Sequence, residues 1–267
     1  MASKIRFLTR THVIYITNML QGPTYLLKCI HCEKHVKMET LESGNGFGAV
    51  EWTDGRVVMP MMPRRFILDY WYCPSCKTFQ SVSDMKEVDE MKNIPMLNAE
   101  KDPRWEQASN IMEPGWRQYL DGIKQWERRL EPYPDWETEI RLLAWRRYND
   151  RYRYKLIKQN KELHDVDIDR YPPEKWPEKR IEVPYQKKMV ENCTEIARWL
   201  YEGNPDKALD KADIIRWLNR FKDALQILKN VDELFEFDER VHLRRYNLLI
   251  NLCKDEDSSL GVVPYSI

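Results

Sequence analysis

The chain has little glycine, no net charge and no long apolar run. Nine of its 267 residues are glycine, whereas ten are tryptophan and fourteen are tyrosine. Disordered and collagen-like chains have the opposite composition, so we expect packed, helix-rich cores. No stretch approaches the roughly 20 consecutive apolar residues that a membrane-spanning helix needs. The sequence therefore predicts a soluble protein with no membrane partner.

A charge excess and the familiar catalytic motifs are also missing. The 43 basic residues balance the 43 acidic residues, so no overall field attracts nucleic acid, and any basic patch is local. The sequence contains no phosphate-binding glycine loop, dinucleotide-binding glycine pattern, nucleophile elbow or His-Glu-x-x-His motif. An enzyme with dispersed catalytic residues is kept as the third hypothesis for the function.

Four of the six cysteines form two Cys-x-x-Cys pairs. Cys29 and Cys32 make the first pair, and Cys73 and Cys76 follow after 40 residues. Two such pairs supply the four thiolates that Zn²⁺ takes in a tetrahedron. The sequence predicts one structural zinc ion, and therefore a site closed to substrate. His35, three residues after Cys32, is the alternative ligand. Because four thiolates already complete the site, we expect His35 either to have no role at the metal or to contact one of the cysteine ligands.

The two other cysteines, Cys193 and Cys253, lie in apolar helical patterns and are predicted to be buried packing residues. This usage fits a reducing compartment better than a disulfide framework, so we expect a cytoplasmic protein. The first 20 residues combine basic and apolar character, but Thr17 and Asn18 interrupt the apolar run. We interpret this segment as a strand and not as a targeting signal.

Short β-branched and aromatic segments surround both cysteine pairs. Strands are predicted at residues 12–17, 25–28, 36–39, 49–52, 56–59 and 66–72. Gly22-Pro23 marks a turn, and Asp54-Gly55 fits a tight hairpin turn between two of the strands. Each cysteine pair then follows the end of a strand.

Cys73-Pro74-Ser75-Cys76 resembles the knuckle of zinc ribbons and rubredoxins, and Cys29-Ile30-His31-Cys32 is similar to it. The resemblance covers about residues 24–82 and implies two knuckles that face each other across one ion. Iron in a rubredoxin-like site and disulfide exchange are the alternatives. Many such knuckles have glycine after the second cysteine, where this chain has Glu33 and Lys77.

Apolar residues then recur at helical spacing. Helices are predicted over residues 116–130, 136–148, 189–200, 208–218, 221–228 and 241–252. Asp135 and Asn204 are predicted N-caps, and Asn219 suits the positive φ at a helix end. The prolines between His164 and Tyr185 predict an extended segment.

Residues 218–231 resemble a tetratricopeptide repeat. Asn219 takes the turn position, Phe221 the aromatic position and Ala224 the position of the small residue. The resemblance covers about residues 205–231 and implies stacked helix pairs that bind a protein partner on a concave face.

A basic and aromatic stretch, residues 141–158, suggests nucleic acid as a second partner. Its candidate contact residues are Arg146, Arg147, Arg151, Arg153, Tyr152 and Tyr154. Arginines can hold phosphates while tyrosines stack on unpaired bases. The favoured interpretation is an amphipathic helix whose basic face is solvated and whose aromatic residues lie in the core.

These patterns predict an α+β protein. It has a β-rich zinc-ribbon-like module at 1–82, a linker at 83–104, a helical domain at 105–255 and a tail at 256–267. The leading hypothesis is an intracellular adaptor in which zinc holds the module rigid and helix pairs present the partner surface. Nucleic-acid binding through the ribbon and the stretch 141–158 is the alternative.

Overall fold

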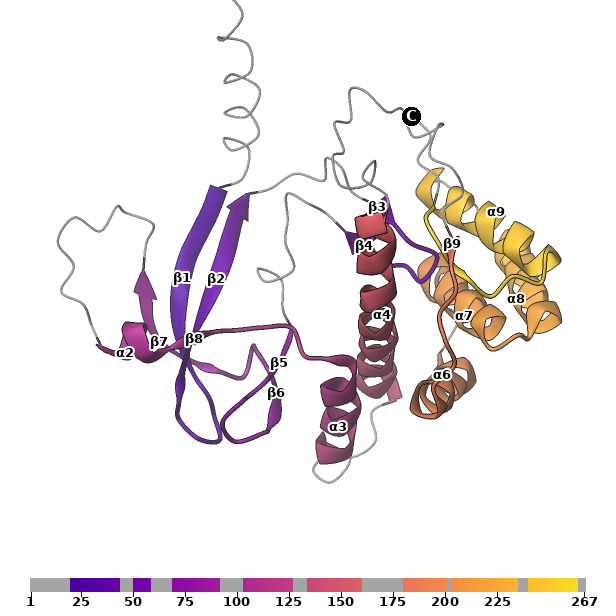
Figure 1. Ribbon diagram of the computed structural model, residues 1–267. Coiled ribbons are helices and arrows are strands. Elements are labelled where there is room, and N and C mark those ends of the chain that lie inside the picture. The colour runs from indigo at the N-terminus through magenta and orange to yellow at the C-terminus, as the bar shows by residue number, and fades with distance from the viewer. Residues whose placement is uncertain are drawn as a thin grey trace, which may run out of the picture. The chain divides into compact units, whose positions relative to one another are not determined.

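The computed structural model describes residues 20–43, 50–58, 69–91, 103–126, 134–159, 180–200, 203–234 and 240–263. The fold is mixed α and β (Figure 1). The chain forms two compact units whose segments alternate along the sequence. Unit 1 consists of Met1–Gly48 and Met59–Pro114, and unit 2 consists of Ala49–Val58 and Gly115–Ile267. No helix in the described ranges has the length and apolar character needed to cross a membrane.

Unit 1 is built mainly from strands. Its elements are β1 (Leu20–Lys28), β2 (His35–Ser43), β5 (Tyr70–Tyr72), β6 (Phe79–Ser81), β7 (Lys86–Met91), α2 (Pro103–Gln107) and β8 (Ser109–Asn110). A four-stranded sheet has the order β7-β1-β2-β8, in which only the β2–β8 pair is parallel. Strands β5 and β6 form a separate antiparallel hairpin. Each hairpin, β1–β2 and β5–β6, thus carries one cysteine pair at its turn.

Strand β1 runs through Gly22-Pro23, so the predicted turn at these residues is wrong. The register between β1 and β2 shifts from Gln21 to Thr24, and this bulge accommodates the proline. Thr40 Oγ1 donates a hydrogen bond to the Pro23 carbonyl at 2.6 Å. A Cβ atom on Gly22 would lie 2.4 Å from that hydroxyl oxygen, so the close approach of the two strands requires glycine.

The observed units differ from the predicted boundaries in three places. The hairpin at residues 49–58, expected in the module 1–82, belongs to unit 2. The expected linker 83–104 contains β7, which pairs with β1. The expected tail 256–267 contains β10 (Leu260–Gly261), which pairs with β9 (Arg180–Ile181). Each difference comes from a pairing between segments that are distant in sequence, which local patterns do not show.

Unit 2 is a helical body with short strands. Its elements are β3 (Val50–Glu51), β4 (Val57–Val58), α3 (Trp116–Trp126), α4 (Pro134–Gln159), β9, α6 (Lys187–Trp199), α7 (Pro205–Trp217), α8 (Phe221–Leu234), α9 (Arg240–Lys254) and β10. Helix α4 begins at Pro134, so Asp135 lies in its first turn and the predicted N-cap at Asp135 is wrong. The predicted strand at 12–17 and most of the predicted extended segment at 164–185 lie outside the described residues.

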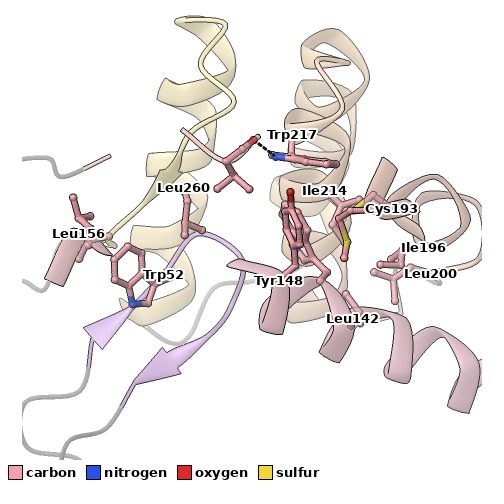
Figure 2. Close-up of a cluster of buried hydrophobic side chains, with 14 residues drawn as sticks. Trp52, Leu142, Tyr148, Leu156, Cys193, Ile196, Leu200, Ile214, Trp217 and Leu260 are labelled. Carbon is pink, nitrogen blue, oxygen red and sulfur yellow. Dashed lines mark hydrogen bonds between the residues drawn. The ribbon is translucent and has the colours of Figure 1, made fainter. Parts of the chain in front are cut away.

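The main core of unit 2 brings the hairpin, α4, α6, α7 and β10 together (Figure 2). Trp52 of the hairpin is fully buried, as are Tyr148 of α4 and Cys193 of α6. The Trp145 and Trp217 rings of α4 and α7 lie 4.7 Å apart between centroids. The predictions that Cys193 and Cys253 are buried are therefore confirmed, and Trp145 is buried in the main core.

A second core joins α7, α8 and α9, with Ala212, Ala224 and Leu228 buried in it. Asn204 caps α7 as predicted, because its side chain accepts a hydrogen bond from the Lys207 N–H at 2.9 Å. Asn219 adopts the predicted positive φ, 59°, between α7 and α8. The local signals at both ends of α7 thus specified the geometry that the structure shows.

Candidate metal centre

The two Cys-x-x-Cys segments have the same backbone hydrogen bonds. In the first, the Cys29 N–H donates to the Lys34 carbonyl at 3.0 Å, and the Glu33 N–H donates to the Cys29 carbonyl at 2.9 Å. In the second, the Cys73 N–H donates to the Thr78 carbonyl and the Lys77 N–H to the Cys73 carbonyl, both at 2.9 Å. Each segment is therefore a tight knuckle that aims both of its sulfurs to one side.

The residue after each second cysteine is in the left-handed region of backbone space. Glu33 has φ 62° and Lys77 has φ 58°. Glycine is the usual residue there because the left-handed conformation costs other residues roughly 1–2 kcal/mol. The chain nevertheless folds into both knuckles without glycine, so the absence of glycine does not change the knuckle geometry.

The knuckles bring the four predicted ligands together. All four sulfurs, those of Cys29, Cys32, Cys73 and Cys76, lie within 4.8 Å of one another. The Cys29–Cys76 and Cys32–Cys73 sulfurs are 3.8 and 3.7 Å apart. A tetrahedron with metal–sulfur bonds of about 2.3 Å has edges of about 3.8 Å. The cysteines form no disulfide, so the four thiols are placed to hold a metal ion.

The thiols of the second knuckle differ in acidity. Burial raises the pKa of Cys73 to about 12. Burial also opposes ionisation of Cys76, but hydrogen bonds from Thr78 and Cys73 lower its pKa to about 7. A divalent cation binds thiolates and displaces their protons, so metal binding here releases protons.

Gln80 is a neighbour of the cluster that the sequence patterns did not single out. It is 1% exposed, and its Oε1 lies 3.8 Å from the Cys29 sulfur. Its Nε2 has no hydrogen-bond partner among the described residues. Amide oxygen and nitrogen positions are interchangeable by rotation, so Gln80 can accept from a thiol or donate to a thiolate. His35, by contrast, opens β2 and is not a member of the four-cysteine group.

The basic stretch 141–158 lies in α4, where several of its arginines form ion pairs. Arg153 is 1% exposed and pairs with Asp54 and Asp150. Arg146 pairs with Asp210 at 2.7 Å, and Arg147 pairs with Asp150 at 3.0 Å. Buried carboxylates thus neutralise arginines that the sequence analysis considered as candidates for contact with nucleic acid.

Arg151 and Tyr152, two further candidates for nucleic-acid contact, also lie in α4. Arg151 is exposed, and its guanidinium carbon lies 4.5 Å from the Tyr148 ring centre and 4.6 Å from that of Tyr152. Tyr152 is partly buried against the main core. The Tyr154 side chain lies outside the described residues. The aromatic rings next to Arg151 thus already contact a cation of the same helix.

A buried ion-pair cluster surrounds the β3–β4 turn in unit 2. Its members are Asp54, Arg56, Arg146, Asp150, Arg153, Asp210 and Arg245. Although burial alone raises the pKa of Asp54, the Arg153 charge and hydrogen bonds from Arg153 and Asn149 hold it below its ordinary value. Gly55 has φ 73°, and a Cβ atom there would lie 2.6 Å from Asp210 Oδ1. The side chains of the cluster therefore pack closely around Gly55, and a larger residue does not fit at this position of the turn.

A groove of about 340 Å³ lies beside α3, α4 and α6 of unit 2. Trp116, Leu120 and Ile123 supply its apolar lining. Its charged lining residues are Arg117, Asp121, Lys124, Arg141, Lys188, Glu191 and Glu195. Arg141 and Asn192 are hydrogen-bonded to each other, so these two polar side chains already have partners. The mixed charges favour neither an anionic nor a cationic ligand.

Comparisons with protein families, with curated proteins and with solved structures find no match to this chain.

Proposed function

We propose that the protein is an intracellular adaptor with one structural Zn²⁺ in unit 1 and a protein-binding surface on unit 2. The observation that carries the metal part is the clustering of four thiol sulfurs within 4.8 Å of one another, on two knuckles with the same backbone hydrogen bonds. Four thiolates with no open position suit a structural zinc ion, which is not redox-active. Six cysteines without a disulfide support a reducing compartment.

The described core of unit 1 contains two of the cysteines, which supports a structural role for the ion. Its buried members include Leu27, Val36, Trp71 and Ile111, together with Cys29 and Cys73 themselves. A metal ion bound by residues of the core adds its binding free energy to the free energy of folding. Zinc would fix the β5–β6 hairpin to the β1–β2 hairpin through four bonds.

Metal analysis of the purified full-length chain tests this part of the proposal. We expect one zinc per chain, and loss of most of it in Cys73→Ser. Cys253→Ser is the matched control, since Cys253 is a buried cysteine of unit 2 outside the cluster, and it should keep the zinc. Iron with the colour of a thiolate site, or equal zinc in both variants, would contradict the assignment.

An exposed and ordered tryptophan supports protein binding by unit 2. Trp199, at the end of α6, is 55% exposed. Its indole N–H donates to Glu195 Oε2 at 3.0 Å, and the Arg198 guanidinium carbon lies 4.8 Å from its ring centre. A tryptophan held in place before binding loses little entropy on association, and such residues are common hot spots of interfaces.

Reconstitution with a purified partner tests the adaptor role. Partners found by crosslinking in cells would be purified and titrated against the full chain. Trp199→Ala should weaken the complex at least tenfold, whereas Leu243→Ala, at another exposed apolar residue, should not. Two results together would favour the nucleic-acid alternative over the adaptor. No purified protein would bind the chain, and the chain would bind RNA in a salt-sensitive manner that is lost in Arg147→Glu/Arg151→Glu.

A further inference from the structure

The β3–β4 hairpin belongs to unit 2 but is encoded between the two cysteine pairs of unit 1. Cys32 precedes the hairpin and Cys73 follows it, so the ligands of one unit enclose a segment of the other. Such an arrangement connects two processes that are usually independent, metal binding in one unit and packing in the other. The connection runs through the chain itself and needs no contact between the units.

The hairpin is attached to unit 2 by hydrogen bonds on several sides. The Thr53 N–H donates to the Gly261 carbonyl at 2.9 Å, and the Thr53 carbonyl accepts from Arg245 Nε at 2.8 Å. The Asp54 carbonyl accepts from Arg146 Nε at 3.0 Å. These bonds and the Asp54 ion pairs hold residues 52–56 in a specific site of unit 2.

Docking of the hairpin closes a loop of the chain, and the length of this loop depends on whether unit 1 is folded. After the hairpin, residues 59–114 belong to unit 1, and unit 2 resumes at Gly115. With unit 1 folded, the described residues 69–91 and 103–110 belong to its hairpins, its sheet and α2, and residues 59–68 connect the docked hairpin to that body. With unit 1 unfolded, docking closes a loop of all 56 residues. Loop closure becomes less favourable as loop length rises.

We propose that metal binding at the four cysteines promotes docking of the β3–β4 hairpin into the helical unit, and that docking promotes metal binding. This inference rests on the proposed metal-dependent fold of unit 1. Shortening the closed segment from 56 to 10 residues changes the docking equilibrium by about tenfold, since closure probability falls with roughly the 3/2 power of length. Coupling is reciprocal, so the metal affinity changes by the same factor.

Hydrogen exchange of the full chain, with and without zinc, tests the coupling in one direction. The Thr53 amide donates to Gly261 of unit 2 only when the hairpin is docked, whereas the Trp52 and Gly55 amides are hydrogen-bonded within the hairpin. Removal of zinc with a chelator should speed exchange of a peptide covering residues 50–58 about tenfold. Exchange in residues 221–234 of α8, which make no hydrogen bond to the hairpin among those described, should change much less.

Zinc affinity of hairpin variants tests the opposite direction. Gly55→Ala places a Cβ atom 2.6 Å from Asp210 Oδ1 at a residue with φ 73°, and it should weaken zinc binding about tenfold. The control is Gly115→Ala, where a Cβ atom would meet only Gln118 Oε1 at 3.5 Å, and its zinc affinity should stay within twofold. Thr53→Val is a milder variant of similar shape that removes the hydroxyl acceptor of the Gly261 N–H.

The outcomes separate this inference from the proposed function. If the chain binds no metal at the cysteines, the metal part of the proposed function and the coupling are both overturned. If zinc binds but its removal leaves exchange at residues 50–58 unchanged, the coupling alone is overturned. Wild-type zinc affinity in Gly55→Ala and Thr53→Val, with faster exchange at 50–58 in these variants, also overturns it. If Gly55→Ala does not fold, the zinc affinity of Thr53→Val tests the coupling instead. A lowered affinity supports the coupling, and a wild-type affinity overturns it.

Discussion

Arg153 Nη1 lies 2.8 and 2.7 Å from the two carboxylate oxygens of Asp54, although the residues are 99 positions apart in sequence. Both side chains are almost fully buried. Arg153 Nε also donates to Asp150 at 3.0 Å, and the Asn149 amide donates to Asp54 at 2.9 Å. This pair is one of several polar links between the β3–β4 hairpin and α4, and it explains why a strongly basic helix has a buried arginine.

Arg153→Ala should destabilise unit 2 strongly. The change leaves the Asp54 and Asp150 carboxylates buried without one of their partners, and breaking a buried pair in this way costs about 3–5 kcal/mol. Urea unfolding followed by tryptophan fluorescence measures the loss. Arg151→Ala, two positions away on the exposed side of α4, should change the free energy of unfolding by less than about 1 kcal/mol. Similar losses in both variants would contradict the role of the pair.

Stability of unit 2 should fall in acid because of Asp54. Burial opposes ionisation of Asp54, but the Arg153 charge and hydrogen bonds hold its pKa below the ordinary value of an aspartate in the folded protein. A lowered pKa stabilises the fold above the unfolded pKa, and this contribution is lost as the pH falls from about 4 through the folded pKa. The difference in unfolding free energy between wild type and Asp54→Asn should therefore shrink below pH 4.

Urea titrations at pH 7, 5, 3.5 and 2.5 test this prediction. Asp223→Asn is the control, because Asp223 forms an exposed pair with Arg220 and such pairs contribute little. A difference between wild type and Asp54→Asn that stays constant from pH 7 to pH 2.5 would show that the Asp54 charge does not stabilise the fold.

Substitutions of Lys77 should change the zinc affinity in opposite directions. Lys77 adopts φ 58° at the end of the second knuckle. Glycine adopts this conformation without steric cost, so Lys77→Gly should stabilise the knuckle by about 1 kcal/mol. A β-branched side chain is worse than lysine there, so Lys77→Val should weaken it. Competition with a zinc-binding dye measures both variants, and equal affinities would rule out backbone strain as a determinant.

Gln80→Leu should weaken metal binding. Gln80 Oε1 lies 3.8 Å from the Cys29 sulfur, and leucine cannot form a hydrogen bond there. Loss of a hydrogen-bonding neighbour of a ligand typically lowers metal affinity by about 10–100-fold, and we expect the lower end. Ser81→Ala is the control, since its hydroxyl bonds to the exposed Ser83 hydroxyl. An unchanged affinity in Gln80→Leu would show that Gln80 only fills space.

Local patterns predicted the parts of this protein whose geometry depends on neighbouring residues. The two Cys-x-x-Cys segments each need only a tight turn, and the structure has both knuckles. Asn204 and Asn219 mark the ends of α7 because capping and left-handed backbone are properties of one or two residues. The position of Trp145 in the core follows from helical periodicity.

The sequence by itself thus identified the four cysteines that cluster in the fold, the mixed α and β class and several of the helices. Only the tertiary structure decided that the hairpin at 50–58 belongs to the helical unit, that β7 completes the N-terminal sheet, and that Arg153 and Arg146 pair with buried carboxylates. The physical reason is that strand pairing and charge neutralisation join residues far apart in sequence. An arginine has the same sequence neighbours whether it is solvated by water or paired with a distant aspartate, so its role depends on the fold.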